Sequence, residues 1–323
     1  MIFAHRTVFT GIALTIVLGA LTGVAAAADT LRVGKAVPFS WTFTPLDLGV
    51  EQGIFAKHGL DIQIVSFAGD AKLQQALASA SIDIGIGSGP GMGFVAKGVP
   101  TFTVAAMAGE PRNMVLVLSA NSAVKSIDEL KGKRIGVTTV GSLTDWLAQR
   151  VAADKGWGPN GVTTVSLGGM DSTRAAMKTG QVDASVTSTE SAYALAENKE
   201  WRVLANLSPY APHFHTHVFF ARRELINNNP DVVRRYLRGW FETIAFMKSN
   251  KDRTVEVTSK VLKLDKAVIS RTYDEVMPMF SEDGHFDARA LDVLRKSYLE
   301  MGILEKEPKD EELLTTKFVP IKP

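Results

Sequence analysis

Two stretches of the chain, one hundred residues apart, repeat the same order of polar and apolar positions. Residues 66–89 (SFAGDAKLQQALASASIDIGIGSG) align without a gap on residues 166–189 (SLGGMDSTRAAMKTGQVDASVTST). Each reads as an extended run, a glycine, a stretch of helical character and a β-prone run that ends at a serine. The match extends toward the N-terminus when a two-residue gap is allowed, so that residues 31–43 correspond to residues 133–145. Each half therefore predicts the order β–α–β–α–β–α.

This alternation favours a mostly parallel sheet with helices packed on its faces. Two such halves predict an α/β fold with two pseudo-repeated lobes. The β-like runs at 114–119 (MVLVLS) and 216–221 (THVFFA) are expected to cross between the lobes as a two-strand hinge. Lobe 1 is then expected to contain residues 29–116 and 218–323, with a helical C-terminal part, and lobe 2 residues 117–217.

Capping patterns predict where several helices begin. TPLD at 44–47 and SLTD at 142–145 both read as helix starts with a capping-box acid three residues after the cap. NPD at 229–231 begins a long amphipathic helix in the C-terminal part. Further helices are expected near 252–262, 265–276 and 287–301.

The first 28 residues have the features of a secretory signal peptide. His5 and Arg6 precede an apolar run over residues 8–21, and AAA at 26–28 fits the small-residue cleavage rule. A membrane anchor is the alternative, but the apolar run is short for a span of roughly 20 residues. Residues 1–28 are therefore predicted to be removed as a signal peptide, and the mature protein to be periplasmic.

Composition argues against several classes of function. Lysine and arginine number 36 against 34 acidic residues, and this balance gives no indication of nucleic-acid binding. The absence of cysteine excludes a disulfide framework, a thiol nucleophile and a thiolate metal site. GIGSGPG at 85–91 does not meet the G-x-G-x-x-G spacing, and no P-loop, G-x-S-x-G or H-E-x-x-H pattern is present. We expect a monomer that is not an enzyme and holds no cofactor.

Four stretches of the chain carry a resemblance to a known family: LGVEQGIFAKHGLDIQIV (48–65), ALASASIDIGIGS (76–88), AVKSIDELKGKRIGVTTVGS (123–142) and MKTGQVDASVTSTESAYAL (177–195). In order and spacing over about residues 30–220, they resemble the periplasmic substrate-binding proteins of nitrate/sulfonate/taurine-type ABC importers. The DELKGKRIGV segment together with the later GQVDA is the most specific part.

The resemblance implies a type II periplasmic binding fold that holds a ligand at the interlobe cleft and closes about a hinge. It further implies delivery of a small-molecule ligand to an ABC permease in the inner membrane with its ATPase. One departure concerns the second-lobe turn, where many relatives have Glu-Pro and this chain has Thr189-Glu190-Ser191. The departure keeps the acid but leaves the substrate class open.

Candidate ligand-binding residues fall mainly at strand-to-helix turns, because the carboxyl ends of parallel strands form the ligand-facing edge of such a sheet. Serine and threonine at helix N-termini suit an anion, or act as caps alone. Glycine allows close approach of the backbone, and an aromatic ring stacks on a planar ligand or packs in the core. The expected ligand-binding residues are Phe39, Ser40, Trp41, Thr42, Gly69, Ser88, Gly89, Arg112, Gly141, Ser142, Thr144, Gly169, Ser188, Thr189, Glu190 and His215.

Several of these residues have competing interpretations. Glu190 is an acid in a cleft otherwise suited to anions, so it meets a residue of a lobe, faces water or accepts an N–H group from the ligand. Arg112 pairs with an anionic headgroup or lies on the surface. Asp83 and Asp183 precede their strands, at the end far from the cleft, and are expected to act in turns or caps.

The histidines of PHFHTH (212–217) alternate, so a strand would point His213, His215 and His217 to one side. Three imidazoles on one face could bind zinc or copper, but no carboxylate or cysteine pattern joins them. We therefore expect no metal site, and expect one histidine, His215, to reach the ligand.

The leading hypothesis is a periplasmic solute-binding component of an ABC importer. The solute would be a small organic molecule: a sulfonate, a taurine-like or nitrate-like compound, or an aromatic or heterocyclic anion. The alternatives are thiamine-pyrimidine-related binding or enzyme activity on the same scaffold, and a ligand-sensing partner of a membrane receptor. The fungal enzymes that make the thiamine pyrimidine use a cysteine-rich motif, which this chain lacks.

Overall fold

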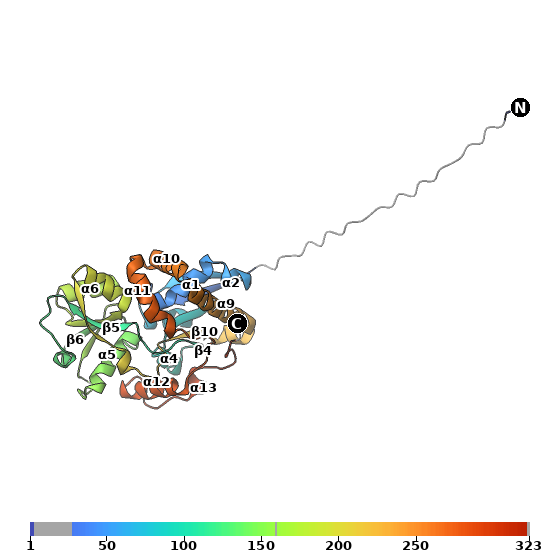
Figure 1. The fold of residues 1–323 in the computed structure, drawn as a ribbon. Coiled ribbons are helices and arrows are strands. Elements are labelled where there is room, and N and C mark those ends of the chain that lie inside the picture. Colours follow the sequence, from blue (N-terminus) through green and yellow to red (C-terminus); the bar gives the residue numbers. More distant parts are fainter. Residues whose placement is uncertain (3–27, 159, 322–323) are drawn as a thin grey trace.

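The computed structural model describes residues 1–2, 28–158 and 160–321, which form two lobes, each built around a five-stranded sheet (Figure 1). The predicted signal peptide, residues 1–28, falls almost entirely on residues 3–27, outside the described part of the chain. No helix among the described residues is long and apolar enough to cross a membrane.

The sheet of lobe 1 has the strand order β2-β1-β3-β10-β4. Its strands are β1 (Asp29–Lys35), β2 (Leu60–Ser66), β3 (Ile84–Ser88), β4 (Thr101–Ala108) and β10 (His217–Arg222). β1 runs parallel to β2 and β3, whereas β10 is antiparallel to β3 and β4. The sheet is therefore mostly parallel, with one reversed strand.

The sheet of lobe 2 repeats this arrangement in the order β7-β6-β8-β5-β9. Its strands are β5 (Met114–Ser119), β6 (Arg134–Val137), β7 (Thr163–Ser166), β8 (Ala184–Ser188) and β9 (Trp201–Asn206). β6 is parallel to β7 and β8, and β5 is antiparallel to β8 and β9. The predicted α/β fold of two pseudo-repeated lobes is confirmed.

Each lobe receives its reversed strand from the chain that arrives from the other lobe. β5 follows β4 of lobe 1 but pairs only with strands of lobe 2, and β10 follows β9 of lobe 2 but pairs within lobe 1. The two strands therefore lie inside the sheets and do not themselves cross, which corrects the expected hinge. The crossing segments are residues 109–113 and 207–216, and the Thr216 N–H donates to Gly109 O across 3.1 Å.

Helices connect most successive strands along the chain. Lobe 1 contains α1 (Thr44–Glu51), α2 (Ile54–Lys57), α3 (Asp70–Ala78) and α4 (Met92–Ala96). Lobe 2 contains α5 (Leu143–Asp154), α6 (Met170–Lys178) and α7 (Thr189–Glu197). The C-terminal part adds α8 (Arg223–Asn228), α9 (Pro230–Ser249), α10 (Lys251–Leu262), α11 (Lys266–Val276), α12 (Ala288–Glu300) and α13 (Asp310–Leu313), close to the predicted ranges.

The long helix α9 packs on lobe 1 because it is strongly amphipathic, and α11 also contacts α7 of lobe 2. The apolar residues Val233, Leu237 and Trp240 of α9 are fully buried, and α9 contacts α1, α2 and β2. Burial of such side chains is the main favourable contribution to folding. Figure 1 shows α9, α10 and α11 beside α1 and α2, and α12 and α13 on the other side of β4.

Two predicted capping boxes differ from the structure. Asp47 does not cap α1; its carboxylate binds the Lys35 ammonium group, with a shortest N–O distance of 2.8 Å. In α5 the acid Asp145 accepts from the backbone N–H of Gly141 at 2.9 Å, one residue before the cap Ser142. In both turns the acid binds another group and does not accept from the backbone N–H of the cap residue, as a capping box requires.

The aspartates of the repeated phrase belong to the scaffold. Asp83 accepts from the Arg32 backbone N–H at 3.0 Å and from the guanidinium groups of Arg32 and Arg222 at 2.7 and 2.9 Å. Asp183 accepts from the Arg134 backbone N–H at 2.9 Å. Each aspartate thus joins the start of the third strand of its half to the first strand, away from the cleft.

Replacement of Asp83 by asparagine is expected to lower the free energy of unfolding by about 2 kcal/mol, because charge-assisted hydrogen bonds contribute about 1.5–3 kcal/mol. Burial opposes the charge of Asp83, but its hydrogen bonds to Arg32 and Arg222 outweigh burial and lower its pKa. Urea denaturation at pH 7 measures the loss. Asp183→Asn is the matched control and should cost less, since the Asp183 side chain is 28% exposed against 11% for Asp83. Equal losses would contradict the assignment.

Candidate functional site

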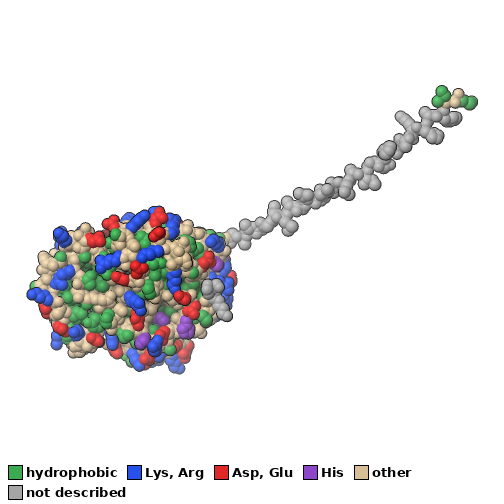
Figure 2. Space-filling model, in the orientation of Figure 1, with side chains coloured by type: hydrophobic (Ala, Val, Ile, Leu, Met, Phe, Trp, Pro, Cys, Tyr) green, Lys and Arg blue, Asp and Glu red, His purple; other side chains and the backbone are tan. Residues whose placement is uncertain are grey.

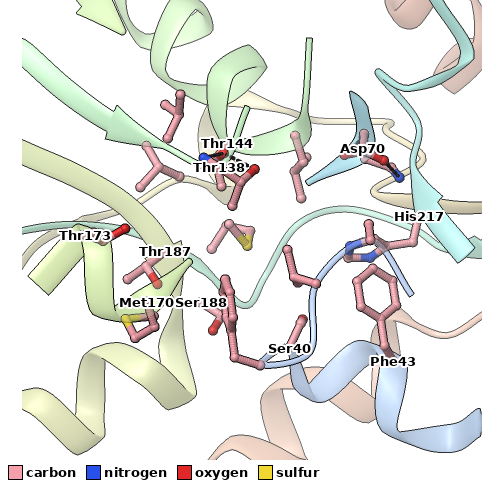
Figure 3. Close-up of a pocket in the computed structure, with 18 residues that line it drawn as sticks. Ser40, Phe43, Asp70, Thr138, Thr144, Met170, Thr173, Thr187, Ser188 and His217 are labelled. Carbon is pink, nitrogen blue, oxygen red and sulfur yellow. Dashed lines mark hydrogen bonds between the residues drawn. The ribbon is translucent and has the colours of Figure 1, made fainter. Parts of the chain in front are cut away.

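A cavity lies between the two lobes and is lined by both. Its volume is about 60 Å³. Figure 3 shows residues of lobe 2, among them Thr138, Thr187 and Met170, facing Asp70 and His217 of lobe 1. The lining residues are Ala36, Val37, Phe39, Ser40, Phe43, Asp70, Ser88 and His217 from lobe 1, and Met114, Val137, Thr138, Leu143, Thr144, Met170, Thr173, Val186, Thr187 and Ser188 from lobe 2.

The carboxyl ends of equivalent strands form the two walls of the cavity. Ser88 is the last residue of β3 and Ser188 the last residue of β8, and both line it. Val137 ends β6, and Ala36 directly follows β1. The sequence expectation that ligand-facing residues lie where parallel strands end therefore matches the position of the cavity.

Hydroxyl groups form a small network on each side. Ser40 and Thr42 share a hydrogen bond of 2.8 Å in lobe 1. In lobe 2 the hydroxyl groups of Ser142 and Thr144 lie 3.0 Å apart, and both bind the Thr138 hydroxyl. Ser142 is the N-cap residue of α5, but its side chain makes no capping bond. Capping alone therefore does not account for this cluster.

Asp70 lines the cavity at the first position of α3, and the sequence expectations omitted it. Its carboxylate accepts from the Ser88 backbone N–H at 2.8 Å and from the Ser88 hydroxyl at 3.0 Å. Burial raises the pKa of Asp70, and the bonds from Ser88 oppose the rise. The repeat carries a signal for this position, because Asp70 aligns with Met170, which lines the cavity from lobe 2.

His217, and not His215, reaches the cavity. The His217 ring packs edge-on against Phe43, with centroids 4.8 Å apart, and burial lowers its pKa to about 3. The His215 Nε2 instead accepts from the Asp287 backbone N–H at 3.0 Å. His213 has a positive φ of 50°, outside β10, so the three histidines do not share one strand face. Within the described ranges, no cluster of three histidine, cysteine, aspartate or glutamate side chains could hold a metal ion.

The structure brings some of the predicted site residues to the cavity and places the others elsewhere. The cavity is lined by Phe39, Ser40, Ser88, Thr144 and Ser188. Thr42 and Ser142 do not line the cavity, but each hydrogen-bonds a residue that does. Thr42 bonds Ser40, and Ser142 bonds Thr144. Arg112 is exposed and lines a separate surface hollow with Glu110 and Tyr193. Lining residues that the sequence expectations missed are Ala36, Val37, Phe43, Asp70, Met114, Val137, Thr138, Leu143, Met170, Thr173, Val186, Thr187 and His217.

Three predicted residues serve structural contacts, and a fourth, Gly169, faces open space. Trp41 is buried, with its ring centroid 6.1 Å from those of Tyr273 and Phe280. A side chain at Gly89 would collide with the His215 carbonyl oxygen at 2.0 Å. The Thr189 backbone N–H donates to Asn113 O at 2.8 Å, and a Cβ at Gly169 would meet no atom within 4 Å.

Gly69 and Gly141 lie where the lobes touch. A Cβ atom at Gly69, in lobe 1, would come within 2.5 Å of the Thr139 side chain, in lobe 2. A Cβ atom at Gly141, in lobe 2, would lie 3.3 Å from the Phe94 ring, in lobe 1. These glycines therefore allow close approach of the two lobes beside the cavity.

Glu190 joins the lobes and does not line the cavity. It is the second residue of α7, is fully buried, and its Oε1 accepts from the Trp41 backbone N–H at 2.8 Å. Its Oε2 has no hydrogen-bond partner in the described part of the chain. Burial raises the pKa of Glu190 to about 7, opposed by the bond from Trp41. Of the three roles considered from the sequence, the structure shows contact with the opposite lobe.

Comparison with known sequences identifies a family. The profile of the family described as NMT1/THI5 like matches residues 41–254. A protein of Brucella abortus named as a binding protein is 28% identical over 261 residues, which cover 80% of each chain. A 4-amino-5-hydroxymethyl-2-methylpyrimidine phosphate synthase of Saccharomyces cerevisiae is 27% identical over 125 residues, or 38% of this chain and 36% of the yeast protein.

Comparison with solved structures identifies the fold. The alkanesulfonate-binding protein SsuA of Xanthomonas axonopodis pv. citri, bound to MOPS, superposes with a TM-score of 0.76 at 22% sequence identity. The match covers 90% of this chain and 97% of that protein. The two-lobed periplasmic binding protein fold, and the resemblance from which it was predicted, are confirmed.

Proposed function

Because the chain belongs to the NMT1/THI5-like family, we propose that it is the periplasmic solute-binding component of an ABC importer and captures a small organic solute between its lobes. The single observation that supports this proposal is the cavity whose two walls are equivalent strand ends of the two lobes. The name of the Brucella abortus relative, a binding protein, agrees with the binding part of this proposal.

Closure of the lobes would bury the solute. The proposed lobes are residues 29–108 with 217–321, and residues 114–206, because β5 and β10 each belong whole to one sheet; this moves the boundaries expected from the sequence. The segments 109–113 and 207–216 between them would act as the hinge. The bond between Trp41 and Glu190 and the approach of Gly69 to Thr139 join the two lobes. A solute that contacts both walls favours this closed arrangement, which a membrane permease with its ATPase would then recognise.

The surface is compatible with a freely diffusing carrier. The face in Figure 2 shows basic and acidic side chains interspersed, without a region of one sign. Such a surface gives no indication of nucleic-acid binding. After removal of a signal peptide at residues 1–28, the protein would act in the periplasm as a monomer.

The test is a screen of the chain from Asp29 onward against small organic and inorganic solutes, read by thermal shift and calorimetry. Ligands should raise the melting temperature by an amount that grows with the logarithm of their concentration over Kd. Small-angle X-ray scattering with and without a hit should show a decrease in the radius of gyration, because closure compacts the molecule. If no solute of the screen binds, the proposal is wrong.

The partial match to a yeast pyrimidine phosphate synthase favours one second candidate, an enzyme on this scaffold. The chain has no cysteine, whereas the fungal enzymes it would resemble use a cysteine-rich motif. Incubation of the purified protein with pyridoxal phosphate decides between the two. Consumption of pyridoxal phosphate would favour the enzyme, and its recovery unchanged would favour solute binding.

A further inference from the structure

The walls of the cavity carry no positive side chain. Among the described residues that line it, none is lysine or arginine, and the titratable side chains are those of Asp70 and His217. An anion that enters would lose its hydration and lie beside the Asp70 carboxyl group. A buried charge is tolerated only when a partner of opposite sign or several hydrogen bonds replace the lost water.

The cations closest to the cavity along the chain are already engaged or face elsewhere. Lys35 directly precedes Ala36 of the cavity wall, but its ammonium group binds both carboxylate oxygens of Asp47, at 3.1 and 2.8 Å. Arg174 directly follows Thr173 of the cavity wall, but its guanidinium group is half-exposed and binds Glu200. Lys72 and Arg112 each lie two positions from a lining residue, and both are exposed. None of these side chains supplies a countercharge for a solute in the cavity.

His217 offers hydrogen bonds without charge. Its ring lines the cavity beside Phe43, as Figure 3 shows, and its Nδ1 has no partner within the described part of the chain. Burial lowers the pKa of His217 to about 3, so the ring is neutral at pH 7. A neutral imidazole has one N–H donor and one acceptor nitrogen. It can therefore donate a hydrogen bond to an uncharged polar group or accept one from it.

The rest of the cavity is small and largely apolar. Phe39, Phe43, Leu143, Met170 and Val186 form apolar parts of its walls. Its volume of about 60 Å³ is well below the roughly 150 Å³ of an apolar cavity that holds benzene. A compact solute of a few non-hydrogen atoms fits these dimensions in the closed conformation.

We infer that the solute is a compact, uncharged molecule, such as a small amide or urea, whose polar group hydrogen-bonds His217 while its apolar part meets Phe39 and Phe43. This inference rests on the proposed function and narrows the class of solute. It replaces the anion that the sequence had favoured with an uncharged molecule. Hydroxyl groups of Ser40, Ser88 and Thr144 supply further neutral donors and acceptors around the polar group.

The experiment compares pairs of probes that share a shape and differ in charge at pH 7.5: urea with nitrate, acetamide with acetate, propionamide with propionate, and methanesulfonamide with methanesulfonate. Thermal shift and calorimetry on the chain from Asp29 onward measure each. The uncharged member of at least one pair should bind at least tenfold more tightly than its anion. Tighter binding of the anions would overturn the inference and leave the proposed function standing.

Two variants give the matched control. His217→Phe keeps a flat ring but removes both nitrogen atoms, and should weaken binding of the uncharged probe at least tenfold. His58→Phe alters a histidine of the same lobe that pairs with Glu242, outside the cavity, and should leave binding unchanged. Equal affinities of the wild type and His217→Phe would contradict the role of His217.

If none of these probes binds, the charge of the solutes found in the broader screen decides the inference. Uncharged hits support it, and anionic or cationic hits overturn it. If no solute binds in either experiment, the proposed function is wrong and the inference fails with it.

Discussion

Replacement of Gly69 by alanine should weaken solute binding at least tenfold, because the added methyl group would hold the lobes apart. The Cβ atom would lie 2.5 Å from the Thr139 Cγ2 and 2.6 Å from its Oγ1. Real Cβ contacts are longer than 3.0 Å, so the Thr139 side chain or the lobe that carries it must shift. A tenfold change corresponds to about 1.4 kcal/mol, a small cost for such a displacement.

Gly69 also has a backbone conformation that other residues rarely adopt, with φ 111° and ψ 166°. Strain of this kind costs about 1–3 kcal/mol, so Gly69→Ala should also unfold more easily. Gly53→Ala is the matched control, since Gly53 has φ 67° and a Cβ there meets no atom within 4 Å. It should lose stability without losing affinity.

A second substitution separates collision from strain. Thr139→Gly added to Gly69→Ala removes the colliding side chain, so affinity should recover while the lost stability does not. Calorimetry gives the affinities and urea denaturation the free energies of unfolding. Unchanged affinity of Gly69→Ala would show that the lobes do not close at this contact.

Replacement of Glu190 by glutamine should remove a loss of stability that the wild-type protein shows as the pH rises from about 5 to about 8. Burial raises the pKa of Glu190 from 4.5 to about 7 in the folded chain. Between these values the folded state binds more protons than the unfolded state, so stability falls with increasing pH. A shift of this size corresponds to about 3 kcal/mol, fully lost above pH 7.

Glutamine keeps a carbonyl oxygen that accepts from the Trp41 N–H but carries no charge at any of these pH values. The difference in free energy of unfolding between wild type and Glu190→Gln, measured in urea at pH 5, 6, 7 and 8, should therefore change by about 3 kcal/mol. Glu197→Gln, at an exposed carboxyl group of the same helix α7, serves as the control and should follow the wild type. Parallel curves for wild type and Glu190→Gln would show that Glu190 does not titrate in this range.

The order of elements and the edge of the sheet that holds the site could be predicted because both follow from local pattern. The repeat placed Ser88 and Ser188 at strand ends, and strand direction alone brings such ends to one edge. The scaffold role of Asp83 followed in the same way from its position before the strand.

The partners of individual side chains could not be predicted because distant segments supply them. Asp47 was read as a cap, but it binds Lys35, which reaches it from β1. His217 reaches the cavity only because β10 inserts between β3 and β4, about 130 residues later in the chain. The choice of His215 failed for this reason, since the alternation of PHFHTH does not fix which histidine begins the strand.

The reciprocal placement of β5 and β10 also sets an order of completion during synthesis. All strands of the lobe 2 sheet lie between Met114 and Asn206, so the ribosome has supplied the whole sheet once that segment has emerged. The lobe 1 sheet begins at Asp29 but has an unfilled position between β3 and β4 until Arg222 is made. The sheet whose first strand is translated first is therefore the sheet whose last strand is translated last.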